Sequence, residues 1–320
     1  MGVINHLIRQ IDEKNCPIVM GLDPVIQFIP DHIKSLALSN FGNTVSAVAE
    51  SFLKFNQELL ERTHEYIPAV KLQMACYEIY GAAGIEAFHK TVALAKDYNL
   101  IVIDDSKRND IGNTANLYAA GHIGRVPLIE GFDHPNLTDF VTINPYLGSD
   151  SILPFAEVCD DLNKGIFILV RTSNRSATEY QEATIGGQYL FEKIAEDVQK
   201  LAEARLVNSQ YASIGAVVGA TWPEESLKLR KSMKNVLFLV PGYGAQGGTA
   251  DQVTNCFNED GYGALINSSR GIIFAYQQPK YQEIFPHSEQ FAEATIMAIL
   301  EMKKDLLTAL SKAGKLPENW

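Results

Sequence analysis

Cysteine is scarce in this chain, and its few copies lie far apart. The four residues, Cys16, Cys76, Cys159 and Cys256, form no C-x-x-C pair, and the seven histidines include no H-E-x-x-H. This pattern gives no zinc-site or disulfide framework, and it fits a reducing cytoplasm. We therefore expect no metal site built from these residues.

Long apolar runs and an excess of positive charge are also missing. The first 15 residues have no long apolar core, and no later run approaches the roughly 18 residues that a membrane span needs. Lysine and arginine number 27 against 38 aspartates and glutamates, so the formal net charge is −11. This charge argues against nucleic acid or an anionic membrane surface as the main partner. We expect a cytoplasmic protein that binds any anion through a local group of donors.

Short apolar runs, by contrast, recur along the 320 residues, and 46% of the residues are apolar, enough for a large core. The eight runs are Ile18–Leu22, Ala69–Gln73, Leu100–Ile103, Phe140–Asn144, Gly165–Val170, Ile214–Gly219, Val236–Val240 and Ala264–Asn267. Segments with the three-to-four spacing of helices lie between them, at 45–60, 85–95, 190–201 and 291–307. This alternation predicts an α/β fold, a (β/α)8 TIM barrel that forms a single domain over residues 1–320, with a doubly wound open sheet as the alternative. We interpret Pro24–Asn43 and Gly121–Asn136 as long loop insertions.

The third run leads into the most densely charged group that follows any of the eight. Ile101–Thr114 reads IVIDDSKRNDIGNT, a D-x-K-x-x-D motif preceded by β-branched residues. Side chains two apart in a strand point the same way, so Asp105 and Lys107 should project to one side, with Asp110 following as the chain turns into a helix. A solvated strand end is the plainer explanation for such a motif by itself, and the context has to decide.

Other runs also end in polar residues, at the positions where the active site of a barrel would lie. Asp23 follows the first run, Lys71 lies in the second, and Arg171-Thr172-Ser173-Asn174 follows the fifth. Because the carboxyl ends of the strands share one face of a barrel, these side chains are expected to converge there.

The seventh run ends in a glycine-rich stretch, Gly242-x-Gly244-x-x-Gly247, which matches the dinucleotide fingerprint G-x-G-x-x-G. That fingerprint belongs after the first strand of a βαβ unit, with an acid about 20 residues further on, and here it follows the seventh run. A phosphate cradle explains it better, since glycines let the backbone approach and expose N–H donors. Arg270, after the eighth run, would add charge and a fork of donors, although a surface salt bridge is an equal alternative for this residue alone.

In this order, the motifs closely resemble those of the orotidine 5′-monophosphate decarboxylase family, in its longer bacterial form, over about residues 18–275. Besides D-x-K-x-x-D, the resemblance depends on GLDP ending at residue 24, KLQMACYE from Lys71, NPYLG from Asn144, VVGATWPEE after the sixth run and SSRG around Arg270. It implies conversion of orotidine 5′-monophosphate to UMP, the last step of de novo pyrimidine synthesis, without a metal or other cofactor. It also implies a homodimer with shared active sites.

The resemblance implies a role for each matching residue. Lys107 would protonate C6 of the pyrimidine, Asp105 would oppose the substrate carboxylate, and Lys71 would hold Asp105 and contact the ribose. The neighbouring subunit's site would receive Asp110, Ile111 and Thr114. The other expected substrate contacts are Asp23 at the ribose, Ser173 (or Thr172 or Asn174) at the pyrimidine, Gln246 with Arg270 at the phosphate, and Gly271.

Two other functions stay open. A metal-dependent sugar-phosphate decarboxylase or aldolase of the same barrel lineage would use D-x-K-x-x-D to hold Mg²⁺, although Lys71 would crowd the cation. A catalytically silent barrel that only binds nucleotide would need its charges merely solvated. For the decarboxylase, either 174–187 or 244–248 is expected to form a lid over the site.

Overall fold

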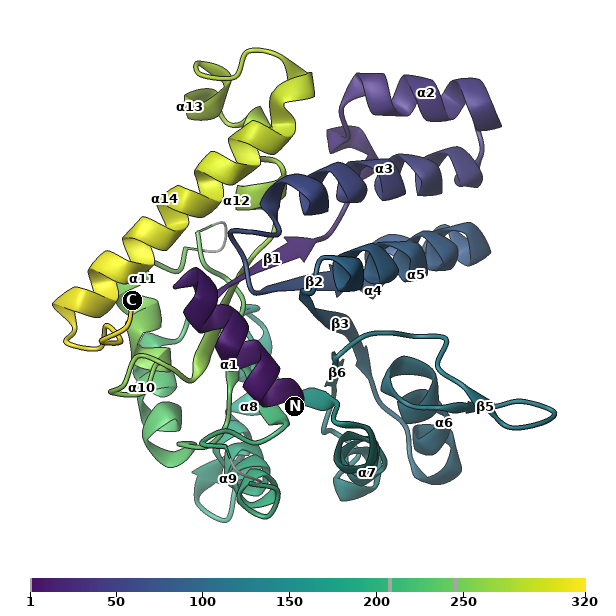
Figure 1. The fold of residues 1–320 in the computed structure, drawn as a ribbon. Coiled ribbons are helices and arrows are strands. Elements are labelled where there is room, and N and C mark those ends of the chain that lie inside the picture. The colour runs from purple at the N-terminus through teal and green to yellow at the C-terminus, as the bar shows by residue number, and fades with distance from the viewer. Residues whose placement is uncertain (1, 207–208, 245–246) are drawn as a thin grey trace.

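Eight parallel strands pair edge to edge and close into a barrel in the computed structural model, which describes residues 2–206, 209–244 and 247–320 (Figure 1). The order around the barrel is β1-β12-β11-β10-β7-β6-β3-β2. The strands are β1 (Ile18–Leu22), β2 (Ala69–Gln73), β3 (Ile101–Arg108), β6 (Phe140–Ile143), β7 (Gly165–Arg171), β10 (Ile214–Val218), β11 (Phe238–Val240) and β12 (Ala264–Ser268). Each overlaps one predicted run, and the predicted (β/α)8 barrel is confirmed.

Helices surround the barrel and cover one of its ends. They are α1 (Val3–Lys14), α2 (Asp31–Phe41), α3 (Val45–Thr63), α4 (Met74–Glu78), α5 (Gly81–Asp97), α6 (Gly112–Ile123), α7 (Leu153–Leu162), α8 (Ala177–Gln181), α9 (Leu190–Glu203), α10 (Pro223–Ser232), α11 (Ala250–Val253), α12 (Arg270–Ile273), α13 (Pro279–Gln282) and α14 (Phe291–Lys312). None of these described helices is long and apolar enough to cross a membrane.

Alternation along the strands divides the apolar side chains between two clusters. On β1, Met20 belongs to the cluster that packs against the helices, whereas Val19 belongs to the cluster inside the barrel. The inner cluster also contains Leu7 and Ile11 of α1, and Figure 1 shows α1 lying across one end of the barrel. Because α1 packs against the first residues of the strands, it covers the amino-terminal end. The polar carboxyl ends of the strands are left at the opposite end.

The stretch 24–43 is mostly helical, so the prediction of a long loop there was wrong. A short 3₁₀ turn, η1 (Ile26–Phe28), precedes α2, which begins after Pro30 and ends at Gly42, where φ is 64°. Ile33 and Ala37, one turn apart, are buried. A proline before a helix and a glycine after it are the usual boundary signals.

The second predicted loop, 121–136, combines two structures. Its first residues complete α6, and the rest forms an antiparallel hairpin of β4 (Val126–Pro127) and β5 (Phe132–Asp133). The hairpin projects beyond α6 in Figure 1. Its large apolar side chains, among them Ile129 and Phe132, are exposed.

Candidate active site at the carboxyl end of the barrel

The polar end of β3 departs from regular strand geometry at Lys107. The pairing of β3 with β6 shifts register between Asp104 and Arg108, and Lys107 has a φ of 51°, in the left-handed region that residues other than glycine seldom adopt. Thr142 of β6 accepts a hydrogen bond from the Lys107 N–H at 2.9 Å. The Lys107 side chain is therefore aimed by a local bulge that a neighbouring strand holds, rather than by the regular alternation expected from the sequence.

Four charged side chains form one chain of ion pairs at this end of the barrel. The Lys107 Nζ lies 2.6 Å from Oδ1 of Asp105, and the Lys71 Nζ lies 2.8 Å from its Oδ2. Lys71 also lies 3.4 Å from Oδ1 of Asp23. The Thr142 hydroxyl donates a hydrogen bond to Oδ1 of Asp105 at 2.9 Å. Negative and positive groups thus alternate from Asp23 to Lys107, and the Asp105 carboxylate is held from three sides.

These contacts decide the ionisation of the two most deeply buried members. Burial raises the pKa of Asp105, but Lys71 and Lys107 outweigh this effect and hold that pKa well below its usual range. Burial lowers the pKa of Lys71, but Asp23 and Asp105 together raise it above its ordinary value. Both groups are therefore charged at neutral pH, and a charged pair is sustained in a buried site.

A cavity of about 520 Å³ opens beside this chain of ion pairs. Its volume is in the range of small-molecule sites. Six of the expected catalytic or substrate-binding residues line it: Asp23, Lys71, Asp105, Lys107, Ser173 and Arg270. Thr172 and Asn174 line it too, but the Thr172 hydroxyl is engaged with Gln181 and Asn174. Polar groups from five of the eight barrel strands or the segments after them therefore converge on one site.

The end of the D-x-K-x-x-D motif lies elsewhere. Asp110 accepts a hydrogen bond from the Ile111 N–H at 2.8 Å and forms no ion pair within the part of the chain that the structure describes. Ile111 and Thr114 are exposed at the start of α6. The fourth charge of the chain of ion pairs is consequently Asp23, and Asp110 does not join it.

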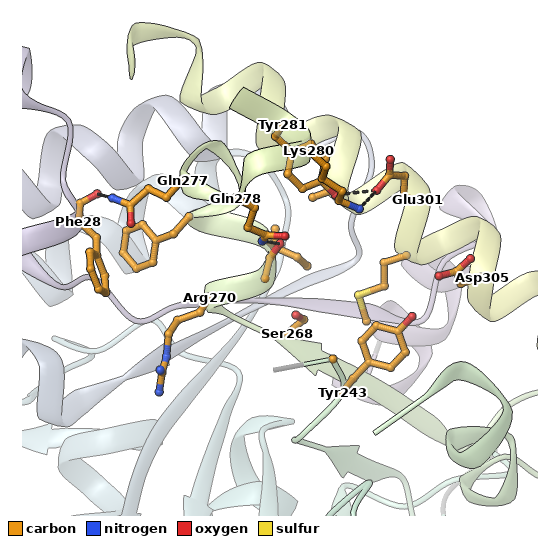
Figure 2. Close-up of a pocket in the computed structure, with 16 residues that line it drawn as sticks. Phe28, Tyr243, Ser268, Arg270, Gln277, Gln278, Lys280, Tyr281, Glu301 and Asp305 are labelled. Carbon is orange, nitrogen blue, oxygen red and sulfur yellow. Dashed lines mark hydrogen bonds and ion pairs between the residues drawn. The ribbon is translucent and has the colours of Figure 1, made fainter. Parts of the chain in front are cut away.

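Gly271 lines a second cavity, of about 600 Å³, which shares Tyr243, Ser268 and Arg270 with the first. Figure 2 shows the Arg270 guanidinium pointing away from the Lys280–Glu301 ion pair on the far side of this second cavity. Arg270 is therefore directed toward the cavity that contains Lys71 and Lys107. Gln246 lies outside the described residues.

The glycine-rich loop after β11 uses several of its own donors. Gly242, Gly244 and Gly247 all have positive φ values, as a tight turn requires. The N–H groups of Gly244, Gly247 and Gly248 donate to carbonyl groups of this same loop. These three amides therefore do not form the expected phosphate cradle. Among the described residues, Arg270 supplies a cation that can bind an anion at this end of the cavity.

Comparison with known proteins identifies the family. Residues 42–282 match the model of the orotidine 5′-phosphate decarboxylase / HUMPS family. The chain belongs to this family. It is 38% identical to orotidine 5′-phosphate decarboxylase of Rhodopirellula baltica over 303 residues, 95% of this chain and 97% of the relative. It is 34% identical to the enzyme of that name from Clostridium acetobutylicum, covering 96% and 100%. The structure of Leishmania donovani OMP decarboxylase is similar with a TM-score of 0.68 and 26% identity, over 95% of this chain and 99% of that one.

The family resemblance inferred from the sequence is thus confirmed. Two residues of the site in this orotidine 5′-phosphate decarboxylase family member were not predicted from the sequence. Thr142, fully buried, joins Asp105 to the backbone of Lys107. Asn267 is buried at the end of β12 and lines the 520 Å³ cavity, and its Oδ1 has no hydrogen-bond partner among the described residues. Each is a polar residue within an apolar run, which was the available signal.

The metal-dependent alternative is not favoured by this geometry. This alternative would use D-x-K-x-x-D to hold the cation, but both oxygens of Asp105 are paired with the ammonium groups of Lys71 and Lys107. Asp110 joins no ion pair in the described structure. No cluster of three or more His, Cys, Asp or Glu residues suited to a metal occurs in the described ranges. The residues present therefore do not fit a Mg²⁺ site at this position.

Proposed function

We propose that this protein decarboxylates orotidine 5′-monophosphate to UMP, without a cofactor, and that residues 1–320 act as one domain in doing so. The observation that supports this most is the Asp23–Lys71–Asp105–Lys107 chain of ion pairs in the 520 Å³ cavity of a family barrel. The near full-length similarity to proteins named orotidine 5′-phosphate decarboxylase agrees with it.

Lys107 is the proton donor in this proposal. Loss of CO₂ from C6 leaves a carbanion without a carbonyl placed to delocalise it, so the site has to stabilise charge at that carbon or supply a proton to it. Two unit charges about 4 Å apart interact by roughly 4 kcal/mol at an effective dielectric near 20. The Lys107 side chain is 41% exposed without substrate, so the interaction reaches that size only when the bound nucleotide excludes water.

In this proposal Asp105 opposes the substrate carboxylate. Its depressed pKa keeps it charged, so it repels a carboxylate at C6 and no longer does so after CO₂ leaves. Lys71 and Thr142 prevent Asp105 from turning away from that repulsion. The attraction of Lys107 and the repulsion of Asp105 both favour the transition state over the bound substrate.

Contacts remote from C6 hold the carboxylate in this position. Asp23 and Lys71 bind the ribose, Ser173 binds the amide edge of the pyrimidine, and Arg270 binds the phosphate, with Gln246 as its partner. Support for Ser173 over Thr172 comes from the Thr172 hydroxyl, which is already engaged. Binding energy from the phosphate end offsets the cost of placing the carboxylate beside Asp105.

The active site is completed by a second copy of the chain. Asp110, Ile111 and Thr114 line neither the 520 Å³ cavity nor the 600 Å³ cavity. In this proposal they contribute to the neighbour's site, with Asp110 at a ribose hydroxyl. Large apolar side chains are exposed close to them, on α6 (Leu117 and Tyr118) and on the loop after β6 (Tyr146 and Leu147). Exposed apolar surface of this kind supports a protein–protein interface.

The test follows the absorbance of orotidine 5′-monophosphate with purified protein, with and without EDTA. Wild-type protein is expected to convert the nucleotide equally in both. Lys107→Ala is expected to lose turnover while still binding UMP, because the phosphate and ribose contacts are untouched. Lys90→Ala removes an exposed lysine of α5 whose ion pair in the described structure is with Glu86; it is the control and should match wild type.

Three results would contradict this proposal. Near-normal turnover by Lys107→Ala would show that Lys107 is not the proton donor. Loss of activity in EDTA would support the metal-dependent alternative. Binding of UMP without any turnover by wild-type protein would favour a silent nucleotide-binding barrel.

A further inference from the structure

Arg171, at the end of β7, has a position that neither strand alternation nor the proposed chemistry explains. The pairing of β7 with β10 shifts register so that Leu169 and Arg171 face successive residues of β10. Val170 is the extra residue of this bulge, and Arg171 points away from the barrel interior. It is 0% exposed, and it is absent from the lining of the 520 Å³ cavity.

The guanidinium group of Arg171 packs against two aromatic rings. It is 4.0 Å from the centre of the Trp222 ring and 4.9 Å from that of Phe191. Its Nη2 lies 2.5 Å from Oε1 of Glu182 and 3.5 Å from Oε1 of Glu225. Nε and Nη1 have no hydrogen-bond partner in the described part of the chain. Glu182 is therefore the close counter-ion of a buried charge.

Glu182 belongs to the segment that was expected to form a lid. Its neighbour Gln181 exchanges two hydrogen bonds with Thr172, accepting from the Thr172 N–H at 3.0 Å and donating to its hydroxyl at 2.7 Å. The Trp222 Nε1–H donates to the Thr172 carbonyl at 2.8 Å. The chain thus leaves β7 at Thr172 and returns to the same place at Gln181 and Glu182.

We propose that Arg171 is a positioning residue that fastens residues 172–182 over the cavity and so holds Ser173 at the pyrimidine. If the segment swung outward, Arg171 would remain buried against its two rings with Glu225 as its nearest carboxylate. Because removing one partner of a buried ion pair leaves an uncompensated charge, this open form is disfavoured even without substrate. Substrate then binds to a segment that is already in place, which saves the ordering cost.

The closeness of Gly219 to Ser173 agrees with this role. A Cβ atom at Gly219 would lie 2.8 Å from backbone and side-chain atoms of Ser173. Thr221 also donates a hydrogen bond to the Ser173 carbonyl at 3.3 Å. The fastened segment therefore packs directly against the end of β10, which leaves Ser173 little freedom to move.

The test uses Glu182→Ala, because Glu182 is 36% exposed at its side chain and its removal leaves the core intact, whereas loss of Arg171 could prevent folding. Glu179→Ala, in the same segment but exposed and without an ion pair in the described structure, is the matched control. Two quantities are measured: hydrogen exchange of residues 172–187 in the ligand-free protein, and kcat and KM for orotidine 5′-monophosphate. A third variant, Glu182→Asp, asks whether a shorter carboxylate restores both.

Glu182→Ala is expected to speed exchange in this segment about tenfold, the lower end for losing a hydrogen bond to a charged group because Glu182 is partly exposed. KM should rise by a similar factor while kcat changes less, since Lys107 and Asp105 are untouched. Glu182→Asp should recover part of both effects, and Glu179→Ala should show neither.

The inference rests on the proposed function, and the two can fail separately. Exchange and KM that both stay at wild-type values in Glu182→Ala would overturn the role of Arg171 and leave the decarboxylase intact. Faster exchange with an unchanged KM would also overturn it, because the segment would be fastened without positioning substrate. Wild-type protein without decarboxylase activity would refute the proposed function, whereas exchange alone would still report the fastening.

Discussion

Replacing Thr142 by valine removes one hydroxyl from the centre of the site at almost constant volume. That hydroxyl donates to Oδ1 of Asp105 at 2.9 Å and accepts from the Lys107 N–H at 2.9 Å. The change therefore removes a hydrogen bond from Asp105 and another from the backbone of Lys107 without altering either residue. We expect both stability and turnover to fall.

The size of the effect follows from the two contacts. A hydrogen bond to a charged group contributes about 1.5–3 kcal/mol, and one between neutral groups about 0.5–1.5 kcal/mol. The second also helps to hold Lys107 at a φ of 51°, a conformation that costs on the order of 1–3 kcal/mol. Lys107 is partly exposed and water can replace some of the loss, so we expect a decrease of roughly 2–3 kcal/mol in the free energy of unfolding. We expect kcat to fall about tenfold to hundredfold as the ammonium loses its fixed position.

Urea denaturation and steady-state decarboxylation measure these two effects. Thr142→Ser, which keeps the hydroxyl, should recover most of kcat, and Thr184→Val, on an exposed two-residue strand, should resemble wild type. A Thr142→Val protein that loses stability but keeps kcat within twofold would refute the reasoning. Thr142 would then support only the fold, and the conformation of Lys107 would not depend on it.

Two further predictions concern the subunits and the charges. Asp110→Ala and Lys71→Ala proteins, each inactive alone, should recover toward about one quarter of wild-type activity when they are mixed. Half of the randomly reassembled dimers contain one subunit of each variant, and each of these dimers has one intact site out of two. No recovery despite demonstrated subunit exchange would contradict a shared site. The depressed pKa of Asp105 contributes stability that is present above its unfolded pKa near 3.9 and is lost as pH falls through the folded value. The raised pKa of Lys71 contributes stability that is present below its unfolded pKa near 10.4 and is lost as pH rises through the folded value. In urea titrations the stability difference between wild type and Asp105→Asn should therefore stay constant from about pH 5 to 9, and a change between pH 6 and 8 would mean that another group controls it.

Much of the architecture could be predicted because it depends on local repetition. Each barrel strand is a short apolar run, and each run shows which side chains face inward through a period of two. The carboxyl-end rule then brings Asp23, Lys71 and Asp105 together without any knowledge of distances. What this reasoning overlooked, such as α2, had local signals at Pro30 and Gly42 that were read as loop residues.

The rest depends on contacts between strands that are remote in sequence. The bulge that directs the Lys107 side chain is stabilised by Thr142, 35 residues later, and no residue next to Lys107 in the sequence indicates a positive φ there. Likewise, the direction of Arg171 depends on a register shift against β10. Both irregularities break the alternation that had allowed the fold to be predicted.

These two irregular positions lie at the carboxyl ends of their strands, and this has a physical reason. Within the barrel, a change of register would turn apolar side chains such as Ile103 or Phe167 away from the inner cluster and leave voids, so the regular pattern is enforced there by packing. At Lys107 and Arg171 the strands extend beyond that cluster, so a bulge there loses no apolar packing. The backbone hydrogen bonds that it disrupts can be offset by other hydrogen bonds and by ion pairs. The site can therefore contain irregular strand geometry, whereas the interior of the barrel tolerates no shift of register. For this reason sequence periodicity predicts the barrel well, but it predicts the side-chain directions of Lys107 and Arg171 poorly.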